Sequence, residues 1–487
     1  MALEVLHKIV VQPDLLASFC KNYDERPNSN KIIQTIGYKL SACMQLCLLY
    51  PDVNDAKKDD GQFESNCQAA ESSGFVCKGF WIPLYQNISR KKLDSLEKHE
   101  AMNLPEGYTL SLAYACITDF CQSIYQIDES MDVCKSIFEL SYSSLLAALS
   151  ILLDASIDES VTDHILHSFS IIVSLACRLG HVVGRDAAIF VLCKAGLPYN
   201  YFIRVFGNTG GLNSLSGLVD TICTVDASSL KNVGDNEGDS SVGPLNHIVA
   251  VGTPCPTPFL PGNFFGQSVV VTAKNIQVFR VLINCLQENG LYMGDCWHLT
   301  LASLQHLIWI LGMKPCLLEG FRTDGDGIDS SSLISGQHNS NMLTTTVMTE
   351  VPIMTAMLNK LFDSTVLLDD VALHHVIAAL CKLSNEAMQV LVSQSGSREP
   401  SFFPIAKLRQ TALVNLSRIE IFWKPVTAHL IEISGHPYSK LREWGAEALM
   451  TLIRSAMKAN INGDDVVSFF NFILFILYKY NYLFDFI

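Results

Sequence analysis

The sequence has little charge and lacks the residue patterns on which most enzymes depend. Only 17% of its 487 residues are charged, and 34 basic against 48 acidic residues give a net charge of −14. It contains no phosphate-binding Gly-Lys-Ser/Thr loop, no Gly-x-Ser-x-Gly elbow and no His-Glu-x-x-His pair. We therefore predict that the protein is not an enzyme and has no catalytic residues, no cofactor and no metal site. The lack of a basic excess also argues against a nucleic-acid partner, because binding to phosphates requires a basic surface.

The cysteines give no sign of disulfides or of metal binding. None of the 16 forms a Cys-x-x-Cys pair, and most lie in apolar stretches with helical spacing. This pattern predicts reduced thiols packed in the core of a cytosolic protein. The first residues lack the basic start and the cleavage site of a signal peptide. Asn87 and Asn415 each begin an Asn-x-Ser glycosylation pattern, and without a secretion signal we interpret both as chance matches.

Helical periodicity is what the sequence does have, and it is clearest at residues 272–315. Apolar residues recur there at steps of three and four in two runs, namely Ile276, Phe279, Ile283 and Leu286, then Trp297, Leu301, Leu304, Ile308 and Leu311. A second stripe in the first run, from Val278 to Cys285, indicates that two faces of that helix are buried. Gly290 and Gly294 mark the turn, and Asp295 is expected to cap the second helix. Such a hairpin requires neighbours on more than one side, as stacked helical repeats provide.

The same periodicity recurs along the chain, interrupted by polar or Gly/Ser-rich stretches. We expect eight regions, which are 1–50, helical; 51–104, a polar linker; 105–207, helical repeats; 208–271, a flexible Gly/Ser/Pro-rich loop; 272–318, the helical hairpin; 319–345, a flexible loop; 346–460, helical repeats; and 461–487, an atypical apolar tail. The prediction is an all-α fold, an armadillo- or HEAT-like helical-repeat solenoid with long disordered inter-helix loops and almost no sheet. Residues 248–251 are expected to form a brief extended piece.

The spacing also predicts individual helices in these regions. They are expected at 108–127, 134–153, 160–180, 185–195, 351–362, 369–393, 403–416, 423–434 and 439–458. In the last of them, Trp444 shares a face with Leu441 and Leu452 and is expected to be substantially buried. Gly445 is expected to allow close approach of a neighbouring helix. Arg442 is expected to point away from this contact or to pair with a neighbour.

Two groups of residues resemble metal sites, and each has a simpler interpretation. Asp370 and His374 stand one helical turn apart, beside Asp369 and His375, as two metal ligands on one helix would. No third ligand is in sight, which favours a capping acid and ordinary helical histidines. Asp324, Asp326 and Asp329 hint at a calcium loop but lack its remaining ligands, which favours a solvated turn.

Other single residues are interpreted as structural. His164 and His167 are read as ordinary helical histidines. Trp297, Trp309 and Trp444 lie on helical stripes, so core packing is the first interpretation and a partner-binding ridge is the alternative.

The tail is unusually apolar. About a dozen near-continuous apolar residues at 466–478 fall short of the roughly 20 that a membrane span needs. A membrane contact is one interpretation. We prefer a translated non-coding stretch that truncates the true C-terminus, because Phe, Ile, Tyr, Asn and Lys share AT-rich codons.

A series of motifs runs through the chain in a fixed order. They are ALEVLHKIVVQPDLLASFCKNYD (2–24), SLLAALSILLDASIDESVTDHIL (144–166), GRDAAIFVLCKAGLP (184–198), TAKNIQVFRVLIN (272–284), DCWHLTLASLQHLIWILGMKP (295–315), LDDVALHHVIAALCKLS (368–384), EPSFFPIAKL (399–408) and HPYSKLREWGAEALMTLI (436–453). Together they resemble the Mon-two family, large helical-repeat proteins related to the BIG and GBF exchange factors of the Golgi. The resemblance implies that 1–50 is the end of a homology-upstream region and that 272–318 is a homology-downstream-like hairpin. The family's N-terminal dimerisation region and its long C-terminal repeats have no counterpart here, so we expect a central fragment or a truncated gene model.

The resemblance also implies a function. The exchange factors carry a catalytic Sec-seven domain between these regions. Here about 55 residues separate position 49 from position 105, too few for a helical domain of roughly 200 residues. The family resemblance therefore implies a non-catalytic scaffold or regulator of vesicle trafficking between endosomes and the trans-Golgi network. The alternatives are a guanine-nucleotide exchange factor for Arf-type GTPases and an unrelated helical-repeat adaptor.

Partners and location follow only from the resemblance. It implies a cytoplasmic protein, peripheral on trans-Golgi network and endosome membranes. The implied partners are a Dopey-family protein, Arf-like small GTPases and a phospholipid flippase. It leaves open a homo-oligomer formed through regions outside this chain.

Overall fold

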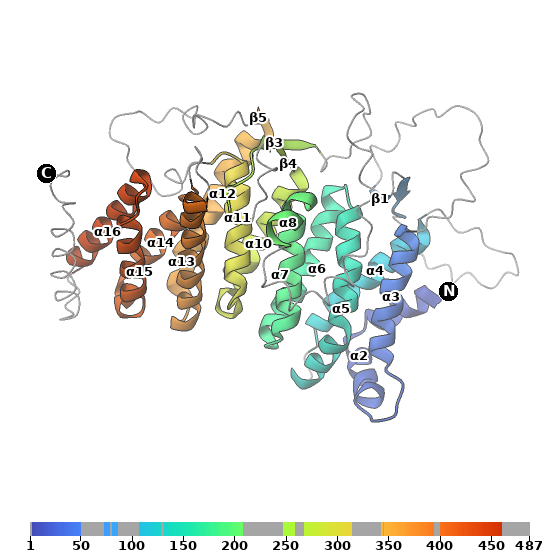
Figure 1. Cartoon of the computed structure of the whole chain (residues 1–487). Coiled ribbons are helices and arrows are strands. Elements are labelled where there is room, and N and C mark those ends of the chain that lie inside the picture. Colours follow the sequence, from blue (N-terminus) through green and yellow to red (C-terminus); the bar gives the residue numbers. More distant parts are fainter. Residues whose placement is uncertain are drawn as a thin grey trace, which may run out of the picture. The chain divides into compact units, whose positions relative to one another are not determined.

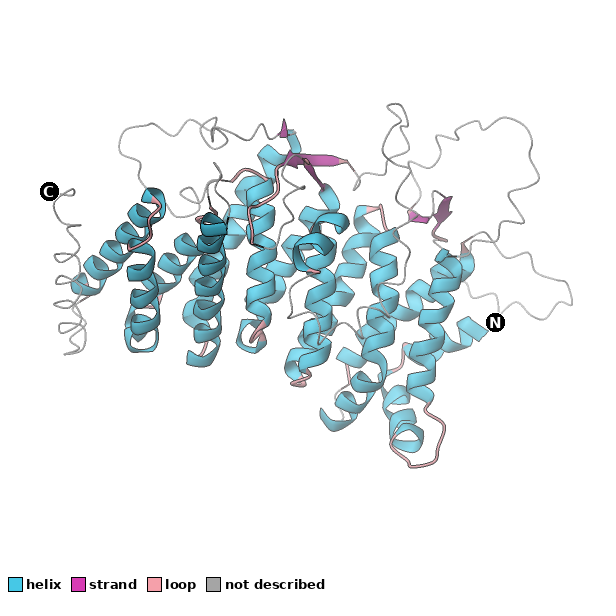
Figure 2. Ribbon diagram, viewed as in Figure 1, coloured by secondary structure: helices cyan, strands magenta, loops and turns pink. Residues whose placement is uncertain are grey.

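The computed structural model describes residues 2–49, 73–77, 80–85, 107–127, 131–207, 247–258, 267–313, 342–343, 345–393 and 400–459. In this part of the chain there are fifteen α-helices and five strands of two to five residues (Figures 1 and 2). The all-α prediction is therefore confirmed. The described residues divide into two compact units, each a stack of packed helices. The first holds 2–254, 267–311 and 342–350, and the second holds 255–258, 312–313 and 351–459.

The first unit contains most of the helices. They are α1 (Ala2–Val10), α2 (Pro13–Phe19), α3 (Ile32–Leu49), α4 (Tyr108–Tyr125), α5 (Met131–Ala155), α6 (Glu159–Arg178), α7 (Val182–Gly196), α8 (Tyr199–Phe206), α10 (Ala273–Asn289) and α11 (Cys296–Ile310). A π-helical turn, Cys20–Asp24, follows α2. Helix α3 packs against α5, α1 against α4, and α10 against both α6 and α7. Each of these helices therefore has neighbours on more than one side, as repeat stacking requires.

The central hairpin has the core that its periodicity predicts. Both apolar runs of the predicted hairpin are buried, the four side chains of the first (276, 279, 283 and 286) and the five of the second (297, 301, 304, 308 and 311), each at 3% exposure or less. On α10 the ring of Phe279 lies against Gly196 at the end of α7, where a Cβ atom would stand 2.9 Å from the ring atom Cε2. A glycine at this position therefore lets α7 and α10 approach closely.

Helix ends follow local sequence signals, with one exception. The Asp158 carboxylate accepts hydrogen bonds from the backbone of Ser160 and Val161 at 2.8 and 3.2 Å, which caps α6. Gly180, which follows α6, has the positive φ of +66° that favours glycine. The prediction for Asp295 was wrong, because its side chain makes no capping hydrogen bond although it stands at the N-cap of α11. Its φ and ψ of −70° and −15° are already helical, and a capping side chain needs an extended backbone.

The short strands form two small sheets in the first unit. Strand β3 (Ile248–Gly252) lies between β4 (Val269–Thr272) and β5 (Met342–Leu343), antiparallel to both. This confirms the extended piece predicted at 248–251. Strands β1 (Gly74–Cys77) and β2 (Phe80–Pro83) form an antiparallel hairpin in register Gly74 to Pro83.

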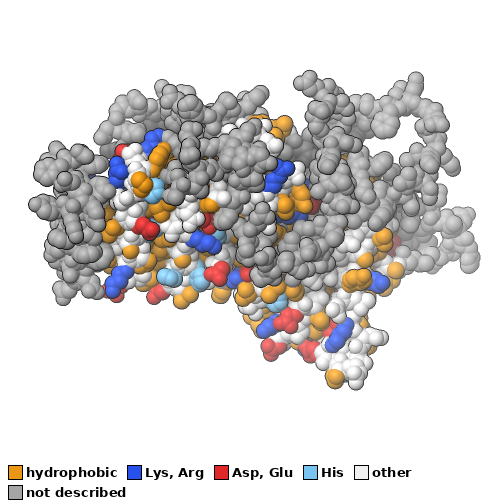
Figure 3. Space-filling view, viewed as in Figure 1, with side chains coloured by type: hydrophobic (Ala, Val, Ile, Leu, Met, Phe, Trp, Pro, Cys, Tyr) orange, Lys and Arg blue, Asp and Glu red, His pale blue; other side chains and the backbone are white. Residues whose placement is uncertain are grey.

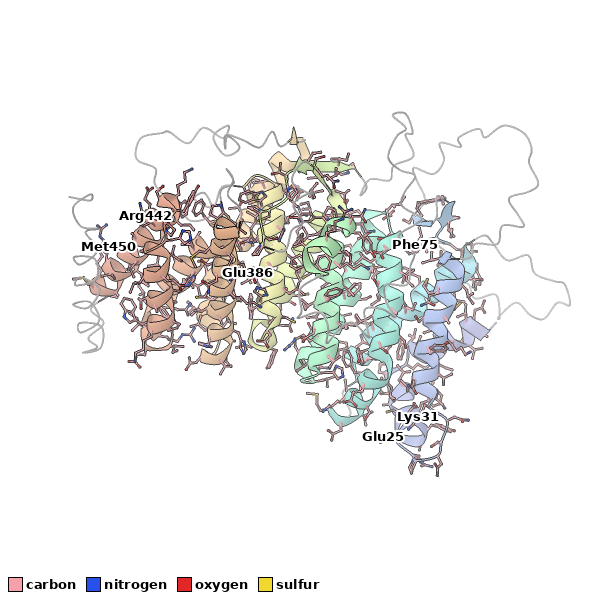
Figure 4. The ribbon with its side chains drawn as sticks, in the orientation of Figure 1. Glu25, Lys31, Phe75, Glu386, Arg442 and Met450 are labelled. Carbon is pink, nitrogen blue, oxygen red and sulfur yellow. The ribbon has the colours of Figure 1, made fainter. Side chains whose placement is uncertain are left out.

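The β1–β2 hairpin was not predicted within the polar linker. Phe75 is fully buried, and its ring meets that of Tyr114 edge to face at 5.7 Å (Figure 4). A backbone bridge joins Phe75 to Ser156 at the end of α5. Four-residue strands give too little alternation to be recognised in a sequence, so the packing of one aromatic ring reveals what periodicity does not.

The second unit is built around a buried helix. The second unit holds the part of α12 (Thr345–Asp363) from residue 351 on, the 3₁₀ turn Ser364–Leu367, α13 (Asp370–Ser393), α14 (Phe403–Val414), the 3₁₀ turn Leu416–Arg418, α15 (Ile419–Ser434) and α16 (Ser439–Lys458). Helix α14 packs against α13, α15 and α16, and it buries even Lys407. The Lys407 ammonium donates to Asn359 Oδ1 and Gln410 Oε1 at 3.1 and 2.7 Å and lies 5.1 Å from the centre of the Phe362 ring. These contacts offset the desolvation of a buried charge.

Several predictions concern residues outside the described ranges. They are the loops at 208–246, 259–266 and 319–341, the calcium-loop interpretation of Asp324 to Asp329, most of the linker with Asn87, and the apolar tail from 461. Among the described helices, α5 and α6 are long and apolar enough to cross a membrane by length and composition alone. Most of each apolar window is buried by protein, 61% in α5 and 67% in α6, as in core helices of a packed stack.

Gly445 provides a test of the close packing in the second unit. A Cβ atom on Gly445 would lie 2.8 Å from Ile433 Cγ2 and 3.0 Å from the Ser434 amide nitrogen. We expect Gly445→Ala to lower the free energy of unfolding by about 1–2 kcal/mol, because overpacking exceeds the gain of about 1 kcal/mol in helix propensity. Urea unfolding measures the change. Gly435→Ala is the control, since a Cβ there would make only ordinary contacts, and a stabilising Gly445→Ala would contradict the close approach.

Candidate interaction surfaces

The predicted metal-like cluster on α13 is a helix start. Asp369 Oδ1 accepts a hydrogen bond from the Ala372 amide at 2.7 Å, so it is the capping acid. Asp370 lies 3.5 Å from the Arg418 guanidinium, and His374 is exposed. In the part of the chain that the structure describes, no group of three or more His, Cys, Asp or Glu side chains could hold a metal ion. The simpler interpretation of these residues is therefore confirmed for Asp369.

The two histidines of α6 have different environments. His164 Nδ1 lies 2.8 Å from the Tyr114 hydroxyl, and the two rings meet edge to face at 5.8 Å. His167 is exposed. The first histidine thus ties α6 to α4, which agrees with a structural role.

The described cysteines are free thiols, and most are buried. Burial raises the pKa of Cys121, Cys177 and Cys193 to about 12, so these thiols are protonated and poorly nucleophilic at neutral pH. They pack as small apolar side chains, as predicted. Asn415 is also buried, and it donates to Thr365 Oγ1 and the Thr411 carbonyl at 2.9 and 2.8 Å. Asn415 therefore cannot accept a glycan in the folded chain.

The three tryptophans differ in burial. Trp297 is fully buried and donates to the Gly290 carbonyl at 3.3 Å, whereas Trp309 and Trp444 are only half-buried. The prediction that Trp444 is substantially buried was therefore wrong in degree. The buried stripe of α16 is centred on Gly445, and its close contact with α15 leaves no room for an indole. Trp444 lies at the margin of the stripe and stacks on Phe402, with ring centres 4.7 Å apart and planes 17° apart.

Arg442, labelled in Figure 4, lies near Trp444 in the first turn of α16. Its guanidinium donates to the carbonyls of His436 and Pro437, just before the helix, at 3.3 and 3.4 Å. It therefore holds the entry to α16 and does not pair with another helix through these bonds.

Large apolar side chains reach the surface at turns between helices. Figure 3 shows hydrophobic side chains among charged ones on one face of the described helices. In the first unit, Leu291 and Tyr292 are 44% and 54% exposed at the turn after α10. The Arg185 guanidinium donates to the Tyr292 carbonyl, beside Val182 and Val183, which are also exposed. These four side chains cluster at the surface where α7 begins.

The second unit has a more exposed group, which we name the apolar knuckle. It consists of Val366, Leu367 and Val371, which are 45%, 80% and 67% exposed at the turn from α12 to α13. Leu367 is the most exposed large hydrophobic residue among the described residues. Neither surface was recognised in the sequence. The available signal was the run Val366–Leu367–Leu368 directly before two aspartates, an apolar run at a helix boundary.

Hydrogen bonds from Arg418 hold the turn that carries the apolar knuckle. Arg418 donates to the backbone carbonyls of Leu368, Thr365 and Val366 at 2.5, 3.1 and 3.3 Å and to Asn415 Oδ1 at 2.6 Å. The Thr365 carbonyl also accepts a hydrogen bond from the Leu368 amide at 3.1 Å, so Arg418 adds a second donor to it. One guanidinium, supplied from the turn before α15, therefore completes the hydrogen bonding of this turn.

Trp444 separates a packing role from a partner-binding role. We expect Trp444→Ala to lower the free energy of unfolding by about 1–3 kcal/mol, less than the 3–5 kcal/mol typical of a fully buried aromatic residue. Trp444→Phe, which keeps a ring against Phe402, should lose less. Urea unfolding of both variants measures this. Unchanged stability together with loss of one binding partner would instead identify Trp444 as an exposed anchor.

Arg418 tests the rigidity of the knuckle turn. Arg418→Met removes the donors but keeps the aliphatic stem, and we expect it to lower the free energy of unfolding by about 2–3 kcal/mol because several carbonyls lose their partners. Hydrogen exchange should also become faster at the start of α13. The control is Lys424→Met on the exposed side of α15. A change within about 0.5 kcal/mol, the range of ordinary surface substitutions, would show that Arg418 does not organise the turn.

The chain is similar to several known proteins. No family model matches the chain. It is 35% identical over 521 residues to the Protein MON2 homolog of Xenopus laevis and 34% identical over 525 residues to that of Homo sapiens, in each case over 94% of this chain. The Monensin-resistant homolog 2 of Caenorhabditis elegans is 28% identical over 95% of the chain.

The matches cover nearly all of this chain but only part of each relative. The chain spans 29% of the length of the frog and human proteins and 28% of the nematode protein. None of these relatives bears the name of an enzyme. Over nearly its whole length the chain is similar to a segment of the Mon2 proteins, which confirms the family resemblance predicted from its motifs.

Proposed function

We propose that this segment is part of a non-catalytic scaffold that acts in vesicle traffic between endosomes and the trans-Golgi network. The observation that carries the proposal is the match of nearly the whole chain to MON2 homologues, together with its stacked helices. Stacked repeats offer long surfaces on which several partners can bind at once. The exposed apolar turns of both units supply such surfaces.

The proposed partners and location come from the family. The partners are a Dopey-family protein, Arf-like small GTPases and a phospholipid flippase. The protein itself is cytoplasmic and binds peripherally to trans-Golgi network and endosome membranes. Three polar residues with notable contacts are used within the fold. Arg418, His164 and Lys407 each contact groups of their own unit, and their contacts stabilise the fold.

A traffic assay tests the proposal. Cells that lack the full-length parent protein should return a cycling receptor from endosomes to the trans-Golgi network more slowly, and re-expression should restore the rate. The tagged protein should lie on both membranes and should co-purify a Dopey-family protein. Normal receptor return in the deficient cells would refute the trafficking role.

A nucleotide-release assay tests the non-catalytic part separately. The full-length protein is added to a panel of Arf-type GTPases loaded with labelled GDP, and we expect release at the uncatalysed rate. A known exchange factor serves as the positive control. Clear acceleration of any member of the panel would establish the exchange-factor alternative and end the scaffold-only proposal.

A further inference from the structure

We propose that the apolar knuckle of Val366, Leu367 and Val371 binds a protein partner that presents an amphipathic helix whose apolar stripe is flanked by lysine or arginine. The inference rests on the scaffold role proposed above, for which it supplies one contact. Exposure is the first argument. Three aliphatic side chains, one of them 80% exposed, lie within six consecutive residues, so covering them would remove exposed apolar surface from water.

Rigidity is the second argument. The hydrogen bonds from Arg418 fix the carbonyls of Thr365, Val366 and Leu368, and Thr365 itself is buried and accepts from Asn415. Asp369 caps the helix that carries Val371. The knuckle is therefore held in one conformation before any partner arrives, which lowers the entropy cost of binding.

Charge selects the partner. Asp363, Asp369 and Asp370 surround the knuckle in sequence and are all exposed. No lysine or arginine occurs between Lys360 and Lys382. Arg418 forms an ion pair with Asp370 at 3.5 Å and adds one positive charge, which leaves three carboxylates against one guanidinium. The rim is thus acidic, and basic groups beside an apolar stripe complement it.

The same charges disfavour two other occupants. An anionic membrane would place its lipid headgroups against the three carboxylates. A second copy of this chain would place acidic rim against acidic rim, in a molecule that already carries a net charge of −14. An amphipathic helix laid into an apolar site is a recurrent mode of peptide recognition, and its flanking residues can carry the required charge.

Synthetic peptides of defined composition test the proposal on the purified chain. The probe is a helix of about 18 residues, or five turns, with leucine at i, i+3, i+4 and i+7 positions and lysine on both flanks. A matched peptide carries glutamate in place of lysine. Titration calorimetry should show that the lysine peptide binds at least about tenfold more tightly, and raising the salt concentration should weaken it.

Variants locate the binding site. Leu367→Ser should weaken the lysine peptide about tenfold or more, as loss of a central contact does. Asp370→Asn should weaken it about two- to fivefold, since a rim charge contributes little. Leu46→Ser is the matched control, because Leu46 is 60% exposed in the first unit. Equal melting temperatures for all variants show that any loss is not due to unfolding.

Three outcomes overturn the inference. They are binding that Leu367→Ser leaves unchanged, equal affinity for the glutamate peptide, and Leu367-dependent binding to phosphatidylserine vesicles in place of the peptide. The traffic assay does not depend on these measurements. Receptor return can therefore require the full-length protein while peptide binding fails, which would reject the knuckle and keep the scaffold role.

Discussion

The structure depends on apolar side chains that each helix must bury on more than one face. Helix α11 shows this most clearly, because every residue from Leu301 to Ile308 is buried. At about 25 cal/mol per Å² of apolar surface removed from water, such a helix is stable only between neighbours. Helix α14 is buried in the same way within the second unit, because all its residues from Phe403 to Arg409 are buried. In both units a helix that is buried on several faces therefore depends on its neighbours for stability.

Close packing leaves the ends of helices to be satisfied by side chains from elsewhere. The Lys274 ammonium donates to the carbonyls of Asp154 and Ser156 at the end of α5. Asn275 donates to the Ala195 carbonyl at the end of α7. Burial lowers the pKa of Lys274 to about 8, so the charged ammonium costs stability at neutral pH, and this cost is recovered as the pH rises above about 8.

The second unit uses the same device. Arg418 serves the carbonyls after α12, just as Lys274 and Asn275 serve those of α5 and α7. In each case the donor lies at least 50 positions along the chain from the acceptor. These bonds therefore join one repeat to another, and they fix the geometry of the turns on which exposed residues are displayed. The cooperation of apolar burial with long-range capping sets the position of each surface.

Periodicity predicted the helices well because it reports burial directly. Helix α16 was predicted with the same bounds as the structure gives, and α13 began one residue from its prediction. Helix α15 was predicted to start at 423 but starts at Ile419, so the residues from Ile419 to Phe422 were missed. Helix α8 has only eight residues and was predicted only as part of a larger helical region. The hairpin of β1 and β2 was missed because its stability comes from contact between Phe75 and Tyr114, which are distant in the sequence.

The surfaces could not be predicted for a related reason. A sequence shows that Leu367 is apolar, but only the packed turn shows that its side chain is left in water while Leu373, six residues on, is fully buried. The position of Trp444 shows the opposite error, since a tryptophan on a buried stripe was displaced to the margin by the close contact at Gly445.

A neighbouring helix supplies hydrogen bonds to the backbone groups of a turn, and this packing decides which side chains of the turn stay exposed. Arg418 donates to the carbonyls of residues 365, 366 and 368, and it also contacts Asp370 and Asn415. The side chains of Val366 and Leu367 remain exposed on the turn that this capping fixes. The interaction that completes the fold is thus also the interaction that fixes the knuckle in place.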